Sequence, residues 1–235
     1  MTKKNTNIIT IRFKGIIFDL DGTLADTLLD ITGSMNRVLS RMGFPAHNYN
    51  AYKYFVGRGL EHLVIEALPE KERRKETIAE CLALLMEDYR VNYLKDTRLY
   101  DGIAAMIDEF EQLNFKMAVL SNKADILTRT LVKALLPDRR FETVIGSRPD
   151  MPAKPDPTGA LQISEIFGIP PLKILYLGDT GIDMMTANKC GMFAIGALWG
   201  FRTAEELMEN GAKILLRHPG ELMTKINEYL SEKSN

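Results

Sequence analysis

The stretch "GIIFDLDGTLADT" (residues 15–27) places two aspartates, Asp19 and Asp21, at the end of a short apolar run. A run of this length that is rich in isoleucine is typical of a buried strand in a parallel sheet. Two carboxylates this close together repel each other, and burying them is costly unless a cation or hydrogen-bond donors meet them. The stretch is therefore either a solvated turn before a helix or a site that holds a metal ion and a phosphate.

Five more apolar runs follow along the chain, and each ends in polar residues or glycine. They span residues 116–121, 141–146, 173–178, 192–197 and 212–216. Segments of helical length, with apolar residues three and four apart, lie between most of these runs, at residues 102–113, 124–136 and 157–167. The first of these helices is expected to stop near Asn114. Strands that alternate with helices predict an α/β fold with a doubly wound parallel sheet, that is, a Rossmann-like core.

One long interval interrupts this alternation. Between about residues 25 and 95 the sequence shows helical patterning and no convincing strand. The interval is too long for a crossover helix and too structured for a loop. We therefore predict an inserted all-helical cap domain over residues 25–94, with residues 1–24 and 95–235 forming the α/β catalytic core.

The composition is that of a soluble globular protein. The 235 residues are 46% hydrophobic and 26% charged, and the net charge of −1 offers no electrostatic footprint for nucleic acid or an anionic membrane. The apolar run near the N-terminus is broken by Thr10, Arg12 and Lys14, unlike a signal peptide, and no stretch reaches the ~20 apolar residues of a membrane span. We expect a cytoplasmic protein, and the sequence leaves its oligomeric state open. The two cysteines, Cys81 and Cys190, make no disulfide framework and are expected to be buried free thiols.

Polar residues recur where the predicted strands end. They are Asp19 and Asp21 after the first run, Ser121, Asn122 and Lys123 after the second, Lys154 after the third, and Asp179 and Asp183 after the fourth. Because ligands of open α/β sheets bind beyond the carboxyl ends of the strands, we expect these side chains to meet in one crevice. Clustered carboxylates destabilise one another unless a hard divalent cation such as Mg²⁺ joins them.

This group of side chains fits phosphoryl chemistry. A Mg²⁺ ion would neutralise and polarise a bound phosphate. One carboxylate could attack phosphorus to form an aspartyl phosphate, while a second, two residues on, protonates the leaving alcohol and later takes a proton from water. Lys154, Ser121 and Thr23 would hold phosphate oxygens. Helix N-termini expected after Lys123 and after Thr180 would add dipoles of the right sign.

Four segments, "DLDGTLADT", "SNK", "KPDP" and "GDTGIDMMTANKCG", resemble in order and spacing the four motifs of the haloacid dehalogenase superfamily. Within it, the chain from Lys14 to about Leu216 is similar to the phosphoglycolate phosphatase group with a helical cap. The resemblance implies a Mg²⁺-dependent phosphatase that acts on a small phosphorylated metabolite, with 2-phosphoglycolate the favoured substrate.

The resemblance also implies roles for individual residues. It makes Asp19 the nucleophile and a Mg²⁺ ligand, and it makes Asp21 the general acid and base, with its backbone carbonyl on the metal. Asp179 would ligate Mg²⁺ directly, and Asp183 directly or through water. The phosphate would be bound by Thr23, Ser121, Asn122 and Lys154, and Lys154 would also offset the charge of the nucleophile.

Several of these residues also have a plainer interpretation. Asp183 could be a solvated residue in the first turn of a helix. Asn122 and Lys123 could be ordinary polar residues at a strand end. Asp26 and Thr27 are at least as well explained as a cap for the first helix of the insert as by a catalytic role.

Specificity is expected to reside in the cap. Arg58, between Gly57 and Gly59, lies in a loop that by resemblance faces the active site, where its guanidinium could grip a substrate carboxylate. The alternative is an exposed arginine in an ordinary turn. Rival activities are a sugar phosphomutase, a phosphonate hydrolase using a cap lysine such as Lys53, or a degenerate binding module, although none of the four motifs is lost.

Overall fold

Six parallel strands form the central sheet of residues 9–233, the part of the chain that the computed structural model describes. The strand order is β5-β4-β1-β6-β7-β8, and every neighbouring pair is parallel. The strands are β1 (Gly15–Phe18), β4 (Lys116–Ala124), β5 (Thr143–Ser147), β6 (Ile174–Gly178), β7 (Phe193–Ala197) and β8 (Ile214–Leu216). Each overlaps one of the predicted apolar runs, so the predicted doubly wound parallel sheet is confirmed.

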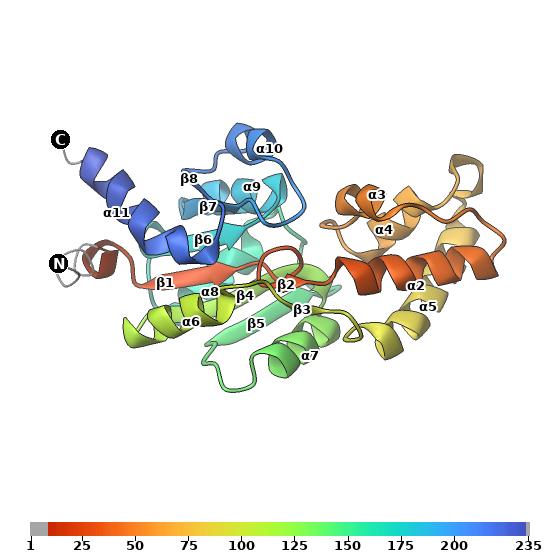
Figure 1. Cartoon of the computed structure of the whole chain (residues 1–235), viewed down its shortest axis with the longest axis horizontal. Helices are drawn as coiled ribbons and strands as arrows, with labels where there is room; N and C mark the ends of the chain where they lie inside the picture. Colours follow the sequence, from red (N-terminus) through yellow and green to blue (C-terminus); the bar gives the residue numbers. More distant parts are fainter. Residues whose placement is uncertain (1–8, 234–235) are drawn as a thin grey trace.

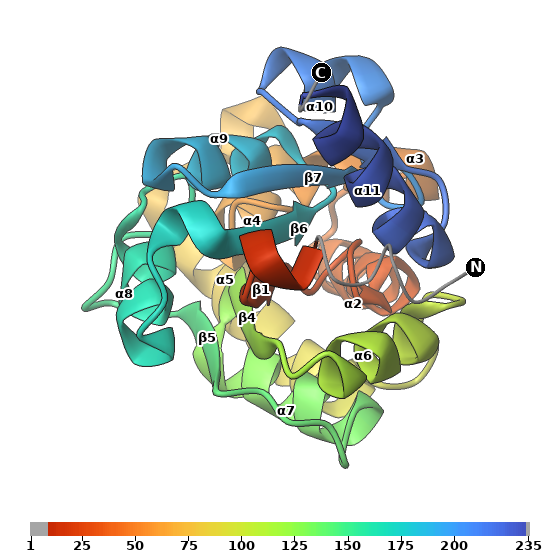
Figure 2. The same cartoon turned by 90° about the vertical axis from the view of Figure 1, so that its left-hand side faces the viewer.

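Helices cover both faces of this sheet. They are α6 (Ile103–Gln112), α7 (Asp125–Leu135), α8 (Thr158–Phe167), α9 (Gly181–Cys190), α10 (Ala204–Glu209) and α11 (Leu222–Glu232), with 3₁₀ turns at Pro171–Lys173 and Pro219–Glu221. Ile16 and Phe18 pack in one cluster with α6 and α11, whereas Ile17 packs in another with α8 and α9 (Figure 2). Both faces of β1 are therefore buried, which explains its unbroken apolar sequence. The predicted stop of the first core helix is also confirmed, since Asn114 has a φ of 55° just beyond α6.

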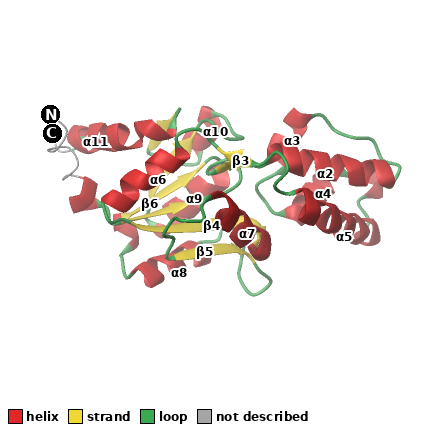
Figure 3. Ribbon diagram, turned by 60° about the horizontal axis from the view of Figure 1, so that its bottom comes forward, coloured by secondary structure: helices red, strands yellow, loops and turns green. Residues whose placement is uncertain are grey.

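A group of four helices lies beyond the carboxyl ends of the strands (Figures 1 and 3). It consists of α2 (Leu28–Arg41), α3 (Tyr49–Phe55), α4 (Leu60–Ala67) and α5 (Lys75–Asn92), with a 3₁₀ turn at Glu70–Glu72. These helices bury a hydrophobic cluster of their own, which Leu127 and Phe201 of the core join. We call this group the cap; its exact limits, residues 25–94, stay a prediction.

Two short strands join the cap to the core. β2 (Ala25–Asp26) pairs antiparallel with β3 (Arg98–Leu99), where the chain leaves the core and where it returns. The buried carboxylate of Asp30 in α2 accepts hydrogen bonds of 2.9–3.0 Å from the backbone N–H groups of Asp96 and Thr97. The expectation of no strand between residues 25 and 95 is therefore wrong at β2, because a two-residue strand is too short to leave an alternating pattern.

The two cysteines are both free, but their surroundings differ. Cys81 is buried in the cap cluster, as predicted. Cys190, at the end of α9, is only half-buried, so its predicted burial is wrong. None of the helices in residues 9–233 is both long enough and apolar enough to cross a membrane.

Candidate active site

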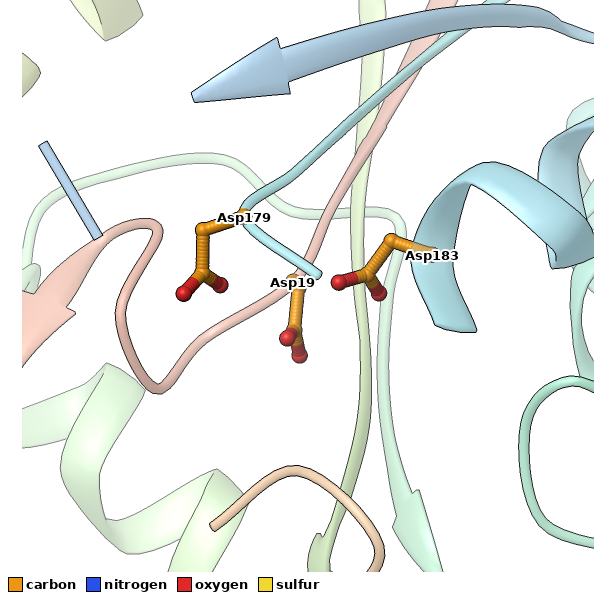
Figure 4. A group of neighbouring side chains, drawn as sticks. All are labelled: Asp19, Asp179 and Asp183. Atoms are coloured by element: carbon orange, nitrogen blue, oxygen red, sulfur yellow. The ribbon is translucent and has the colours of Figure 1, made fainter. Parts of the chain in front are cut away.

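Three buried carboxylates meet at the carboxyl edge of the sheet. Asp19 follows β1, Asp179 follows β6, and Asp183 lies in the first turn of α9. Each offers an oxygen that lies within 4.8 Å of oxygens from the other two, and Figure 4 shows the three side chains side by side. The predicted convergence of the first and fourth motifs is therefore present in the fold.

The backbone around Thr180 holds Asp183 in place. Asp183 Oδ2 accepts hydrogen bonds from the backbone N–H of Thr180 at 3.1 Å and from its hydroxyl at 2.6 Å. The backbone N–H of Asp183 donates back to the Thr180 hydroxyl oxygen at 3.4 Å, which completes a capping box at the start of α9. A Cβ on Gly178 would lie 2.3 Å from Asp183 Cβ, so only glycine allows this approach. Because Asp183 is fully buried, the alternative of a solvated first-turn residue is wrong.

Asp179 is fixed by two hydrogen bonds. Its Oδ1 accepts one of 2.9 Å from the hydroxyl of Thr23, and its Oδ2 accepts one of 2.8 Å from the backbone N–H of Phe201. Gly22, with a φ of +84°, and Gly200 both pass too close to this carboxylate to carry a side chain. Thr23 was predicted to bind phosphate, but its hydroxyl proton is committed to Asp179.

Lys154 lies among these carboxylates. Its buried ammonium is 2.6 Å from Asp183 Oδ1 and 2.9 Å from Asp19 Oδ1. The contact with Asp183 is a hydrogen bond, whereas the contact with Asp19 is a close charge pair without hydrogen-bond alignment. Asp19 Oδ1 is thus buried and has no hydrogen-bond partner within the described residues, which leaves it available to a further ligand.

Burial and crowding destabilise the charged form of this group. Burial, followed by the neighbouring charge of Asp183, raises the pKa of Asp19 to about 7, although Lys154 opposes the shift. Burial and then the charges of Asp19 and Asp183 raise the pKa of Asp179 well above its ordinary value. A divalent cation would relieve this repulsion, and an all-oxygen donor set with an unpartnered carboxylate oxygen suits a hard ion such as Mg²⁺. The residues present therefore fit the implied metal.

The second motif contributes three buried residues from β4. Ser121 lines the cavity next to Asp19. The Asn122 amide donates hydrogen bonds of 3.0 Å to the carbonyl oxygens of Gly57 and Lys154, and its Oδ1 accepts one of 2.8 Å from the Lys154 backbone N–H. Asn122 was predicted to bind phosphate, but its amide is fully used in holding two backbone segments together.

Lys123 and Thr27 both contact Asp21. The Lys123 ammonium donates to Asp21 Oδ1 at 3.0 Å and Oδ2 at 3.2 Å, and the Thr27 hydroxyl donates to Oδ1 at 2.7 Å. Thr27 occupies the N-cap position of α2 without a side-chain capping bond, so the capping interpretation of this residue is wrong. The side chains of Lys123 and Thr27 are therefore both engaged at the site. In the sequence, Lys123 was marked by its place in "SNK", directly after Asn122.

A small cavity of about 30 Å³ lies between the strand ends and the cap. It is lined by Asp19, Asp21, Ser121, Asn122 and Lys123 from the core and by Ile31, Val56, Gly57, Gly59, Leu60 and Leu63 from the cap. The glycines that flank Arg58 thus face the cavity, whereas Arg58 itself is exposed and is not part of the lining. The structure does not bring the Arg58 side chain to the site.

The chain belongs to the haloacid dehalogenase-like hydrolases, because the model of that family matches residues 16–197. It is 28% identical over 217 residues to the phosphoglycolate phosphatase of Aquifex aeolicus, covering 92% of this chain and 98% of the relative. It is also 28% identical to the phosphoglycolate phosphatase of Mesorhizobium japonicum, covering 92% and 95%. A haloacid dehalogenase-like hydrolase of Streptococcus pneumoniae shares the fold, with a TM-score of 0.82 at 22% identity over 91% of this chain and 98% of that one.

Proposed function

We propose that this hydrolase is a Mg²⁺-dependent phosphatase of small phosphate monoesters, with 2-phosphoglycolate the favoured substrate. The observation that carries the proposal is the buried cluster of Asp19, Asp179, Asp183 and Lys154 at the carboxyl edge of the sheet. The two curated relatives named above, both phosphoglycolate phosphatases, match this chain over nine-tenths of its length and support the substrate class.

The metal would be held by Asp19, Asp179, Asp183 and the backbone carbonyl of Asp21. When bound, Mg²⁺ would offset the crowded charge and polarise the phosphate. Both Asp183 oxygens already accept hydrogen bonds, from Lys154 and from Thr180, so we propose that Asp183 acts on the metal partly through water.

The chain's own residues would carry the reaction in two steps. An Asp19 carboxylate oxygen attacks phosphorus, the bond to the substrate oxygen breaks, and Asp21 gives its proton to that leaving oxygen. Water then attacks the aspartyl phosphate, Asp21 takes the proton of this water, and inorganic phosphate leaves with Asp19 restored. Lys154 and Ser121 hold the phosphate oxygens during both steps.

The cavity favours a phosphatase over its relatives in the superfamily. A phosphomutase needs an acid or base from the cap, and a phosphonate hydrolase needs a cap lysine to form a Schiff base. The cap residues that line the cavity within the described part of the chain are apolar or glycine, and Lys53 is not among them. This lining supplies neither an acid or base nor a lysine, so we favour phosphomonoester hydrolysis over both of these activities.

The test is a panel of phosphate monoesters, assayed with Mg²⁺ and with EDTA. We expect activity only with the metal and the highest kcat/KM for a small anionic substrate such as 2-phosphoglycolate. Equal rates in EDTA would contradict the metal site, and a clear preference for a hexose phosphate would contradict the substrate class.

A further inference from the structure

A buried cation beside the proposed acid and base is left without a role by the proposed function. The Lys123 side chain is 2% exposed and lies at the end of β4, on the cavity wall. Its backbone carbonyl accepts a hydrogen bond of 3.0 Å from the Thr128 hydroxyl, which fixes the chain at this point. A buried ammonium is stable only when its three N–H groups find acceptors.

The cap supplies one of these acceptors. The Lys123 ammonium donates to the Tyr89 hydroxyl at 2.8 Å and lies 4.7 Å from the centre of the Tyr89 ring. Tyr89 is fully buried in α5, a helix of the cap. Burial raises the pKa of Tyr89 to about 12, so its hydroxyl stays neutral and accepts from the lysine.

The remaining acceptors belong to Asp21. Both Asp21 oxygens lie within 3.2 Å of Lys123 Nζ, so the lysine bridges the core carboxylate and the cap hydroxyl. No hydrogen bond joins Tyr89 to Asp21 directly among the described residues. If α5 were displaced from the core, one N–H of a buried ammonium would lose its acceptor, and the Asp21 carboxylate alone would hold the Lys123 ammonium.

We propose that Lys123 is a positioning residue through which the seating of α5 orients the Asp21 carboxylate toward the leaving group. The proposal rests on the proposed function for the role of Asp21. It makes proton transfer efficient only when the cap lies against the core, so that a substrate is hydrolysed after it has been enclosed. The contact between Tyr89 and Lys123 depends on the position of the cap, and Lys123 couples that position to the orientation of the Asp21 carboxylate.

The conservative test is Tyr89→Phe, which removes one hydroxyl and keeps the ring. Phenyl phosphate and p-nitrophenyl phosphate have similar size and no carboxylate, but phenolate needs protonation as it leaves far more than p-nitrophenolate does. We expect kcat for phenyl phosphate to fall about tenfold, a part of the full general-acid effect, with little change for p-nitrophenyl phosphate. Tyr93→Phe, at the C-cap position directly after α5, is the matched control and should leave both rates unchanged.

Equal losses of kcat on both substrates would overturn the proposal, since a general packing defect affects both. A rise in KM for 2-phosphoglycolate with kcat unchanged would overturn it too, because Lys123 would then be reading the substrate carboxylate. If the wild-type protein itself hydrolysed none of these substrates, the proposed function would be overturned instead.

A second measurement needs no substrate. The melting temperatures of wild type, Tyr89→Phe, Asp21→Asn and the double variant, measured with Mg²⁺ present, form a double-mutant cycle. We expect the double variant to lose less than the sum of the two single losses, because both act on Lys123. Additive losses would show that Tyr89 and Asp21 are independent and would overturn the coupling.

Discussion

The side-chain amide of Asn122 donates a hydrogen bond of 3.0 Å to the carbonyl oxygen of Gly57, which ties the end of β4 directly to the cap loop. The same side chain makes two hydrogen bonds with the Lys154 backbone. One residue of the core thus contacts both Lys154, the proposed catalytic lysine, and the cap wall of the cavity.

Asn122→Ala is expected to destabilise the protein and to lower kcat/KM. It leaves the carbonyl of Gly57 and the buried carbonyl and N–H of Lys154 without these partners, at a cost of about 1–3 kcal/mol for each group that water does not reach. Denaturant unfolding gives the free energy of unfolding, and steady-state kinetics gives kcat/KM. Asn50→Ala, at an exposed position of α3, is the control and should change neither quantity. An Asn122→Ala variant with unchanged stability and unchanged kcat/KM would contradict the positioning role of Asn122.

Thr23→Val is expected to raise the Mg²⁺ concentration needed for half-maximal activity by about 10–100-fold, the usual effect of losing a residue that orients a metal ligand. The Thr23 hydroxyl donates to Asp179, and valine keeps the shape but not the donor. The concentration is read from Mg²⁺ titrations of activity. Thr130→Val, on the exposed side of α7, is the control, and an unchanged Mg²⁺ requirement in Thr23→Val would argue against Asp179 as a ligand.

Arg202→Ala should loosen the cap loop. The guanidinium of Arg202 donates to the carbonyl of Lys53 and, at 3.0 Å, to that of Val56, so the core caps the C-terminal end of α3. We expect a loss of about 1.5–3 kcal/mol in unfolding free energy, the range for hydrogen bonds to a charged group. A rise in KM should accompany it because Val56 lines the cavity. Arg140→Ala, at an exposed position, is the control, and matching results for the two variants would contradict the contact.

Arg58→Ala tests the remaining candidate for the substrate carboxylate. The side chain is exposed in this structure, so contact requires it to turn inward when substrate binds. In that case kcat/KM for 2-phosphoglycolate should fall by an amount that corresponds to about 2 kcal/mol of lost transition-state stabilisation. This loss is within the range for truncating one partner of a buried charge pair. The value for p-nitrophenyl phosphate should stay near that of the wild type. Equal losses would point to cap folding, and no loss would make Arg58 a surface residue.

The sheet was predictable because its inner strands β1, β4, β6 and β7 are largely buried on both faces, whereas the edge strands β5 and β8 are partly exposed. Each inner strand left an apolar run, and the polar residues that follow β1, β4 and β6 had to meet at one edge. The strands β2 and β3, which join the cap to the core, were not predictable, since strands of two residues have no pattern to detect.

The partners of the site residues were also beyond reach of the sequence. Thr23 and Asp179 are 156 positions apart, and Lys123 and Tyr89 are 34 apart on different parts of the fold. Residue type and strand position predicted that such side chains would be near the site. They did not distinguish a residue that binds phosphate from one that positions another residue of the site. The hydrogen bonds of Thr23 to Asp179 and of Asn122 to Gly57 are of the second kind.

The central claim is that Asp19 attacks phosphorus, and the most direct measurement is kcat of Asp19→Asn with 2-phosphoglycolate and Mg²⁺. An amide cannot form the acyl phosphate, so we expect no turnover above background from a variant whose circular dichroism and unfolding remain native-like. Asp138→Asn, at an exposed position, should retain wild-type kcat. Wild-type-like turnover by a sequence-verified Asp19→Asn preparation would contradict the assignment of Asp19 as the nucleophile.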